Sequence, residues 1–294
     1  MKRTRIFLAT VLVAVLLQGC GVTRNGAGKA EPVKSRSISV LAIGNSFSVD
    51  AMQYLYDILK EDRAEEIVLG NLYIGGCTLQ RHEGNFTGNA PAYKYYKNTT
   101  GEWTTTESFK PLDALDERDW DYITLQQASG VSGIPDSYSP YLETLLGIVR
   151  EHCPNAKLYW HMTWAYQGNS THKEFPKYNS DQMTMYRAIV GAVREKVLTH
   201  NEFTGVIPSG TAIQYLRGSV YGDTVTRDGY HLSRDAGRFA AALTWAGTLY
   251  GTDPRSITWH PAKYTYTDKQ LKAIRNAVRK ALKKPYIGDS AARP

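Results

Sequence analysis

The sequence predicts an α/β fold of three layers, in which helices cover both faces of a mostly parallel five-stranded sheet. Short β-branched apolar runs alternate with longer segments whose apolar residues recur at helical spacing, a pattern typical of parallel sheets. The 294-residue chain is 42% hydrophobic and 21% charged, so it has enough apolar residues for a large core. This composition excludes a disordered chain, a collagen-like repeat and a protein with many membrane spans.

Five apolar runs are the expected strands. They are short and rich in β-branched or aromatic residues, as strands that are buried on both faces usually are. They lie at residues 37–43, 66–74, 121–126, 156–164 and 203–208.

Helical spacing of apolar residues predicts the helices between and after these strands. The first covers residues 49–59, and a serine or threonine at the start marks each of the others. The last, at 267–284, begins with a capping box, in which a threonine and the glutamine three residues later cap each other. The expected starts of these later helices are Ser139–Pro140, Ser180, Ser233 and Thr267 with Gln270.

Residues 84–111 interrupt the alternation of strands and helices. They are rich in Gly, Asn, Thr and Tyr and predict a β-hairpin around residues 98–101. We expect this insertion to cross the face where the parallel strands end. The whole of 37–294 is then one α/β domain.

The first 36 residues predict export. Residues 1–19 combine a basic start with an apolar run at 6–17, which is typical of a secretory signal peptide. The ending Leu-Gln-Gly-Cys resembles a bacterial lipobox and implies lipid on Cys20, with polar residues 20–36 as a flexible tether. We expect an exported lipoprotein, anchored in a membrane of a Gram-negative-type bacterium and facing the periplasm or the cell surface. The alternative is an ordinary cleaved signal with an incidental cysteine.

Charge and cysteine content exclude several kinds of partner. The formal charge of +7 falls to +4 when the signal peptide is removed, because that segment holds three basic residues and no acidic one. No metal-binding or nucleotide-binding motif is present, so we expect no metal, no cofactor and no nucleic-acid partner. After export, Cys77 and Cys153 either form a disulfide or stay as two buried thiols.

Ser46 stands at the end of the first expected strand, directly before a helix, in the segment IGNSFS. Ligands of parallel α/β sheets bind at the carboxyl ends of strands, where unpaired helix amides stabilise developing negative charge. Ser46 is therefore a candidate nucleophile. The alternative is that Ser46 or Ser48 only caps the helix.

Asp228 and His231 form a second candidate element, in the segment DGYHLS before the fourth helix. An aspartate three residues ahead of a histidine in a turn places a carboxylate beside one imidazole nitrogen. The other nitrogen is then free to accept the proton of a serine hydroxyl, which is a weak nucleophile unaided. The alternative is a loop aspartate with a surface histidine. His161 lies within a strand and is expected in the core or a pocket wall.

Together, Ser46 after the first strand and Asp228-x-x-His231 before a late helix resemble the SGNH/GDSL hydrolase superfamily of serine esterases. The resemblance covers residues 37–251 and implies a flavodoxin-like fold, with Ser46 as nucleophile and Asp228 and His231 completing the triad. The first motif reads GNS where the family typically has GDS.

The resemblance also implies an oxyanion hole. The family's glycine after the second strand is matched in the segment YIGGCT, so the backbone N–H groups of Gly76 and Ser46 are expected donors. The family's asparagine after the third strand is missing, because that strand ends ITLQQASG. A glutamine amide donates the same hydrogen bond, so Gln126 or Gln127 is expected in its place, with Gln126 preferred. This pattern resembles an exported lipoprotein branch of the superfamily.

The expected function is hydrolysis of carboxylic esters, with O-acetyl groups on glycans as the expected substrate. Flat aromatic rings suit sugar rings, and Tyr73 and Trp164 are the expected substrate-binding residues. Two alternatives stay open: a non-catalytic glycan-binding surface lipoprotein on a hydrolase fold, and a lysophospholipase or thioesterase of the same fold. The complete triad argues against the first, and the lack of a long apolar lid argues against the second.

Overall fold

The structure, a computed structural model, describes residues 37–287 of the chain. The expected signal peptide, the tether and the lipidated Cys20 lie outside the described residues. Within 37–287, no helix is long and apolar enough to cross a membrane.

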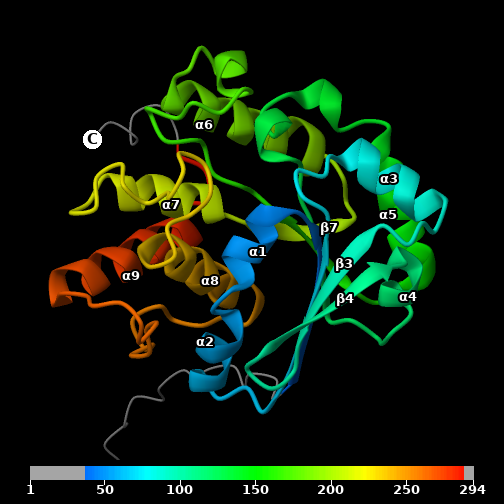
Figure 1. Cartoon of the computed structure of the whole chain (residues 1–294), viewed down its shortest axis with the longest axis horizontal. Helices are drawn as coiled ribbons and strands as arrows, with labels where there is room; N and C mark the ends of the chain where they lie inside the picture. The colour runs from blue at the N-terminus through cyan, green and yellow to red at the C-terminus, as the bar shows by residue number, and fades with distance from the viewer. Residues whose placement is uncertain (1–36, 288–294) are drawn as a thin grey trace, which may run out of the picture. The chain divides into compact units, whose positions relative to one another are not determined.

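The sequence prediction of an α/β fold is confirmed (Figure 1). Five parallel strands lie in the order β2-β1-β5-β6-β7, which is the flavodoxin-like order. Their positions agree with the five expected strands to within a few residues. The strands are β1 (Ser37–Gly44), β2 (Glu66–Tyr73), β5 (Tyr122–Leu125), β6 (Lys157–His161) and β7 (Phe203–Ile207).

The sheet has seven strands rather than five, because the insertion joins it. The hairpin of β3 (Tyr93–Asn98) and β4 (Trp103–Phe109) pairs antiparallel to β2 and extends that edge of the sheet. The expectation of an excursion across the face of strand ends is therefore wrong in placement, although the hairpin itself is present. A helix, α3 (Leu79–Thr87), occupies the beginning of the insertion.

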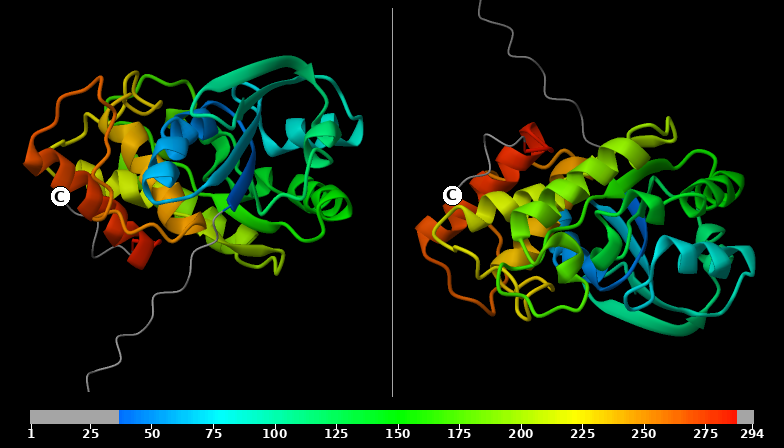
Figure 2. Two further views of the ribbon diagram at one scale, coloured as in Figure 1. Left: turned by 90° about the horizontal axis from the view of Figure 1, so that it is seen from below. Right: turned by 90° about the horizontal axis from the view of Figure 1, so that it is seen from above.

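Helices form the two outer layers (Figure 2). On one face α1 and α2 contact β2 and pack against α8, with α7 and α9 beside α8; on the other face α3, α4 and α5 pack together. The remaining bounds are α1 (Ser46–Met52), α2 (Leu55–Glu61), α4 (Pro111–Leu115), α5 (Tyr141–His152), α6 (Gln182–Ala192), α7 (Ser209–Arg217), α8 (Ala236–Leu249) and α9 (Asp268–Lys283).

Several helix starts differ from the sequence prediction. The expected helix over 49–59 is two helices, because the backbone at Tyr54 leaves helical geometry (φ −113°, ψ 10°). Pro140 precedes α5 as its N-cap, and α6 is capped by Asp181 rather than Ser180, since the Asp181 carboxylate accepts from the Thr184 amide. The fourth expected helix, α8, begins three residues after Ser233. The capping box of α9 is present as expected.

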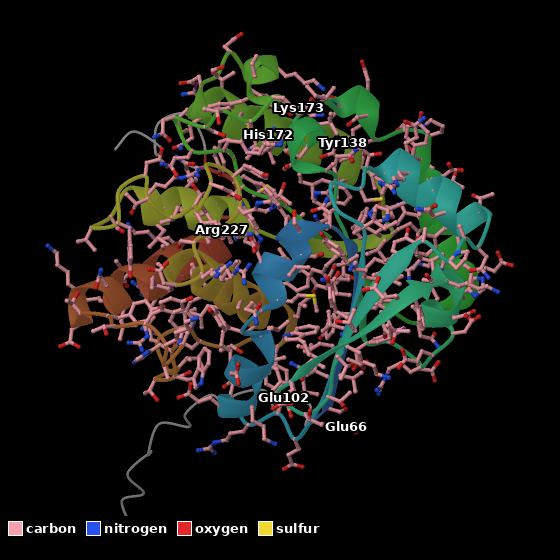
Figure 3. All side chains as sticks on the ribbon, viewed as in Figure 1. Glu66, Glu102, Tyr138, His172, Lys173 and Arg227 are labelled. Atoms are coloured by element: carbon pink, nitrogen blue, oxygen red, sulfur yellow. The ribbon has the colours of Figure 1, made fainter. Side chains whose placement is uncertain are left out.

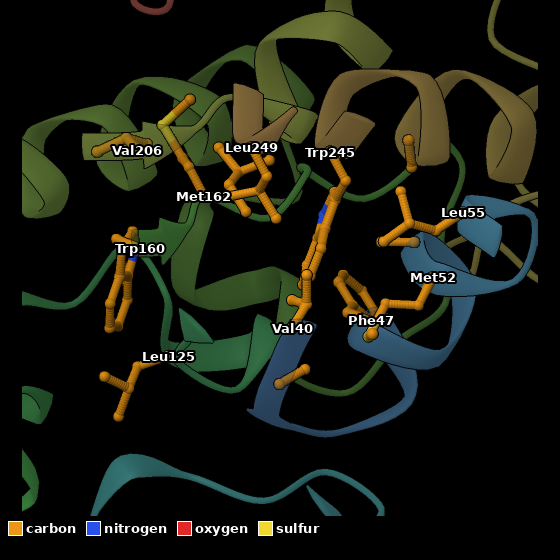
Figure 4. Close-up of a cluster of buried hydrophobic side chains, with 14 of the residues drawn as sticks. Val40, Phe47, Met52, Leu55, Leu125, Trp160, Met162, Val206, Trp245 and Leu249 are labelled. Atoms are coloured by element: carbon orange, nitrogen blue, oxygen red, sulfur yellow. The ribbon is translucent and has the colours of Figure 1, made fainter. Parts of the chain in front are cut away.

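The core beside the turn of Ser46 is tightly filled. Figure 4 shows Trp245 of α8 next to Val40 of β1 and the α1 side chains of Phe47 and Met52. All four are at most 1% exposed. The first turn of α1 is therefore fixed between the sheet and α8, and this position fixes Ser46.

Candidate active site

Ser46 is the first residue of α1, at the carboxyl end of β1. A side chain at Gly44 would place its Cβ 2.5 Å from Ser48 Oγ, so only glycine lets the strand turn into the helix this closely. Asn45 caps α1 by accepting a hydrogen bond from the Phe47 amide. Ser46 itself does not cap the helix, so its hydroxyl is available for chemistry.

The structure brings the three predicted triad residues together. His231 Nε2 lies 2.8 Å from Ser46 Oγ, and His231 Nδ1 lies 2.7 Å from Asp228 Oδ2. The second carboxylate oxygen of Asp228 accepts from the backbone N–H groups of His231 and Tyr230. Partial burial raises the pKa of Asp228, but the hydrogen bonds from His231 outweigh it and hold this pKa below its ordinary value. An ionised Asp228 orients the imidazole with Nε2 toward the serine.

Asp50, which sequence reasoning missed, ties the loop of His231 to α1. Its carboxylate is 1% exposed and accepts from the Leu232 amide at 2.8 Å. Arg227 contacts both Asp50 oxygens and donates to the Leu232 carbonyl, and Arg238 adds a contact of 2.6 Å. Figure 3 shows Arg227 beside α1. The loop that carries His231 is thus ion-paired to the helix that carries Ser46.

Trp164 is buried, and its prediction as a substrate-binding residue is wrong. It is 0% exposed and stacks on Phe47 with ring centroids 4.2 Å apart. Its indole N–H donates to the Tyr230 carbonyl at 2.7 Å. Trp164 therefore supports Tyr230, the residue before His231, and has no exposed ring face that a ligand could contact.

A chain of buried hydrogen bonds supports the turn of Ser46. Gln126 Nε2 donates to Asn45 Oδ1 at 2.8 Å, and Gln126 Oε1 is 2.8 Å from His161 Nδ1. Asn45 Oδ1 also accepts from the Phe47 N–H, so it is the amide nitrogen of Gln126 that faces it. Gln126 Oε1 then faces His161 Nδ1, and His161 must carry its proton on Nδ1. His161 Nε2 then accepts from Ser209 Oγ. Burial lowers the pKa of His161 to about 3, so the chain is neutral.

The same chain reaches the predicted glycine turn. Asn45 Nδ2 donates to the Cys77 carbonyl at 3.2 Å, which links the turn of Ser46 to the turn of Gly75 and Gly76. Gly76 has φ +60° and is exposed, a backbone conformation that favours glycine. An aspartate at position 45 would place a carboxylate oxygen against the Cys77 carbonyl, whereas asparagine donates a hydrogen bond to it.

Gln127 does not reach the triad, and its prediction as an oxyanion donor is wrong. Its amide nitrogen donates to the backbone and side chain of Ser137, and its oxygen accepts from the Leu79 and Ala128 amides. Gln126 gives one N–H to Asn45 and is 2% exposed. Its other N–H, and the amides of Ser46 and Gly76, stay as predicted donors.

The remaining predicted residues have the following places. Tyr73, at the end of β2, is half-buried, with its ring centroid 5.4 Å from that of Tyr96. Cys77 and Cys153 are buried free thiols, so the disulfide alternative does not hold in this structure. Within 37–287, no group of three or more His, Cys, Asp or Glu residues is placed to hold a metal ion.

The fold and the site together define a flavodoxin-like α/β protein in which a serine, a histidine and an aspartate lie in contact at the carboxyl end of the parallel strands. The chain belongs to the family described as "Domain of unknown function (DUF4886)", whose model matches residues 39–281. The crystal structure of a DUF4886 family protein from Bacteroides uniformis ATCC 8492 is 41% identical, with a TM-score of 0.82. The match covers 87% of this chain and 98% of that one.

More distant solved structures are also similar. One is a catalytic mutant of Axe2, an acetylxylan esterase from Geobacillus stearothermophilus, at 12% identity and a TM-score of 0.45. That match covers 74% of this chain and 96% of that one, and it is too remote to bear on substrate. No curated protein sequence matches this chain.

Proposed function

We propose that the protein is a serine esterase that hydrolyses carboxylic esters, with O-acetyl groups on glycans as substrate. The observation that carries the proposal is the continuous contact from Ser46 Oγ through His231 to Asp228, at 2.8 and 2.7 Å. The contact joins residues 185 positions apart in the sequence, at the edge of the sheet where α/β enzymes bind their ligands.

The proposed reaction has two halves. Ser46 Oγ attacks the ester carbonyl carbon while its proton moves to His231 Nε2, and the ionised Asp228 stabilises the imidazolium. His231 then gives that proton to the departing alcohol, which leaves an acyl group on Ser46. Water attacks this acyl group with His231 again as base, and the carboxylic acid leaves as Ser46 regains its proton.

The negative oxygen of each tetrahedral intermediate needs hydrogen-bond donors. The N–H groups of Ser46 and Gly76 are the proposed pair, since Asn45 is bonded to both turns. The free N–H of Gln126 is the proposed third donor. The glycan substrate is supported by the predicted export and by the half-buried Tyr73 at the end of β2. Attachment to a membrane through lipid on Cys20 is part of the same proposal.

A fluorophosphonate probe and a series of 4-nitrophenyl esters test the function. Wild-type protein should react covalently with the probe and hydrolyse the acetate, whereas Ser46→Ala should lose both. Ser256→Ala, at an exposed serine far along the chain, is the matched control and should keep both. If folded wild-type protein reacts with neither the probe nor any ester, the esterase hypothesis fails and the glycan-binding lipoprotein is favoured. If the protein prefers esters with long acyl chains, the proposed substrate is a lysophospholipid or a thioester instead of a glycan.

A further inference from the structure

A pocket of about 240 Å³ lies between α1 and the inserted hairpin. We call it the hairpin pocket. Its size is below the range of about 300–1,000 Å³ for drug-sized ligands, so it suits one small ring. It is lined by Val49, Met52, Gln53, Asn71, Tyr96, Trp103 and Thr105.

The hairpin pocket begins one helical turn from the candidate nucleophile. Residues three to four apart share a face of a helix, so Val49 and Gln53 lie on the face of α1 that carries Ser46. Gln53 keeps helical geometry at the end of α1 (φ −51°, ψ −40°). At about 1.5 Å per residue, the pocket wall extends roughly 4–10 Å along α1 from Ser46.

The opposite wall is a row across the extended sheet. Asn71 of β2 pairs with Tyr96 of β3, and Tyr96 pairs with Thr105 of β4, so the three side chains share one face. Trp103 lies two residues before Thr105 and faces the same way. The hairpin thus supplies three of the seven lining residues, including both aromatic ones, and the pocket would lack this wall without the insertion.

Asn71 gives the pocket a buried polar group with bonding capacity to spare. It is 1% exposed, and one end of its amide lies 2.9 Å from Ser48 Oγ. Among residues 37–287, no side chain or backbone group forms a hydrogen bond with the other end of this amide. Because Asn71 lines the pocket, its amide can form a hydrogen bond with a hydroxyl group of a ligand.

The lining combines flat rings with amides and a hydroxyl. Gln53, Asn71 and Thr105 are three polar residues among seven, and their hydrogen-bonding groups would find no partner on an acyl chain. Trp103 and Tyr96 offer aromatic faces to the C–H face of a sugar, while the polar groups match its hydroxyls. Tyr73 lies beside Tyr96, with ring centroids 5.4 Å apart and the rings tilted by 51°, and it ends β2 opposite Gly44 of β1. It therefore extends the aromatic surface toward the turn of Ser46.

We propose that the hairpin pocket binds one pyranose ring of the alcohol part of the ester. The proposal rests on the proposed ester hydrolysis at Ser46. It assigns substrate selection to the hairpin and to Asn71, and it leaves the triad to act on the acyl group one helical turn away.

The first test compares a sugar ester with a small ester in Trp103→Ala. The probes are the acetylated methyl glycosides of xylose, glucose and N-acetylglucosamine, of which the best wild-type substrate is used, and 4-nitrophenyl acetate. Trp103→Ala should raise KM for the glycoside on the order of tenfold and leave 4-nitrophenyl acetate hydrolysis within twofold. Thr106→Ala, at an exposed hairpin position on the other face, is the control and should change neither.

A second variant fills the pocket instead of emptying it. Thr105 is exposed at a strand position that favours aromatic residues, so Thr105→Tyr should fold. It should raise KM for the glycoside as Trp103→Ala does, and thermal unfolding checks both variants. Hydrolysis of 4-nitrophenyl acetate but of no glycoside would overturn the sugar pocket. An unchanged KM for the glycoside in both variants would also overturn it. An effect on longer 4-nitrophenyl esters alone would overturn it too, because the occupant would then be an acyl chain.

Binding to Ser46→Ala separates this proposal from the proposed function. The acetylated glycoside should bind Ser46→Ala, as followed by calorimetry, and binding should weaken on the order of tenfold when Trp103→Ala is added. If wild-type protein hydrolyses no ester but this binding and its loss are observed, the pocket proposal stands and the esterase proposal fails. If wild-type protein hydrolyses the esters and the double variant binds as well as Ser46→Ala, the pocket proposal fails alone.

Discussion

The two halves of the triad are held by different kinds of interaction. Beneath Ser46, Asn45, Gln126 and His161 form a neutral chain of hydrogen bonds, and all three are at most 2% exposed. His231 lies on a loop that is held by ion pairs between Asp50 and two arginines, and the Asp228 side chain is 38% exposed. Ser46 is therefore positioned by neutral groups of the core, whereas His231 is positioned by ion pairs to a buried carboxylate and by the partly exposed Asp228.

The largest effect is expected on the exposed side of this comparison. Asp228→Asn replaces the carboxylate by an amide, which no longer fixes the tautomer of His231 or stabilises the imidazolium. Turnover of 4-nitrophenyl acetate should fall by about 10- to 10⁴-fold in a protein that stays folded. Steady-state kinetics with circular dichroism measures both. A wild-type rate would show that the carboxylate is dispensable.

The neutral chain is tested by alanine at each of the two neighbouring glutamines. Gln126→Ala removes the contact with Asn45 and the predicted third oxyanion donor, so turnover should fall on the order of 10²–10³-fold with little change in KM. Gln127→Ala leaves the Leu79 and Ala128 amides without their acceptor and should cost stability instead. Kinetics and chemical denaturation separate the two outcomes. Wild-type turnover in both variants would show that only the backbone N–H groups of Ser46 and Gly76 stabilise the oxyanion.

The charged cluster is tested by Asp50→Asn. The amide can still accept from Leu232, but the two arginines lose their negative partner, and the free energy of unfolding should fall by about 3 kcal/mol. Turnover should fall with it, since the His231 loop loses its attachment to α1. Asp113→Asn, at an exposed position in the first turn of α4, is the control. Denaturation and steady-state kinetics measure both effects, and wild-type stability in Asp50→Asn would show that the cluster does not hold the His231 loop.

Local patterns in the sequence were sufficient to predict the parallel strands and the three residues that the structure brings together at the candidate site. Ser46 follows a β-branched run, and Asp228 and His231 share one turn, so each element is visible within ten residues. The edge strands of the hairpin were placed wrongly, because β4 is almost entirely exposed and has no alternation of apolar residues to show which strand it pairs with.

Contacts between distant segments could not be read from spacing. Asp50 and Arg227 are 177 residues apart, and neither stands in a motif. Trp164 has the flat aromatic ring that is typical of sugar-binding residues, but it packs on Phe47 in the core. Gln126 and Gln127 are neighbours whose roles depend on which side of the strand end each one faces, and the sequence does not show this. The one available signal was the position of Asp50, four residues after Ser46 on the expected helix.

The smallest expected effect concerns the pH dependence of stability, and it comes from the neutral chain. His161 is fully buried, and burial lowers its pKa to about 3, whereas an unfolded histidine has a pKa of about 6.5. Below pH 6.5 the unfolded chain binds a proton that the folded protein excludes. The stability contributed by neutral His161 is therefore complete above pH 6.5 and is lost as the pH falls toward 3.

The expected slope is about 1.4 kcal/mol per pH unit for each such histidine. His82 is also fully buried with a pKa of about 3, so two histidines contribute between pH 6 and 4. Denaturant unfolding of wild-type protein and His161→Gln at pH 7, 6 and 5 measures the slope. The variant should be less stable at pH 7 but should lose less stability on acidification, because only His82 remains. Parallel curves for the two proteins would show that His161 accepts a proton in the folded state, and the neutral chain beneath Ser46 would then have to carry a charge.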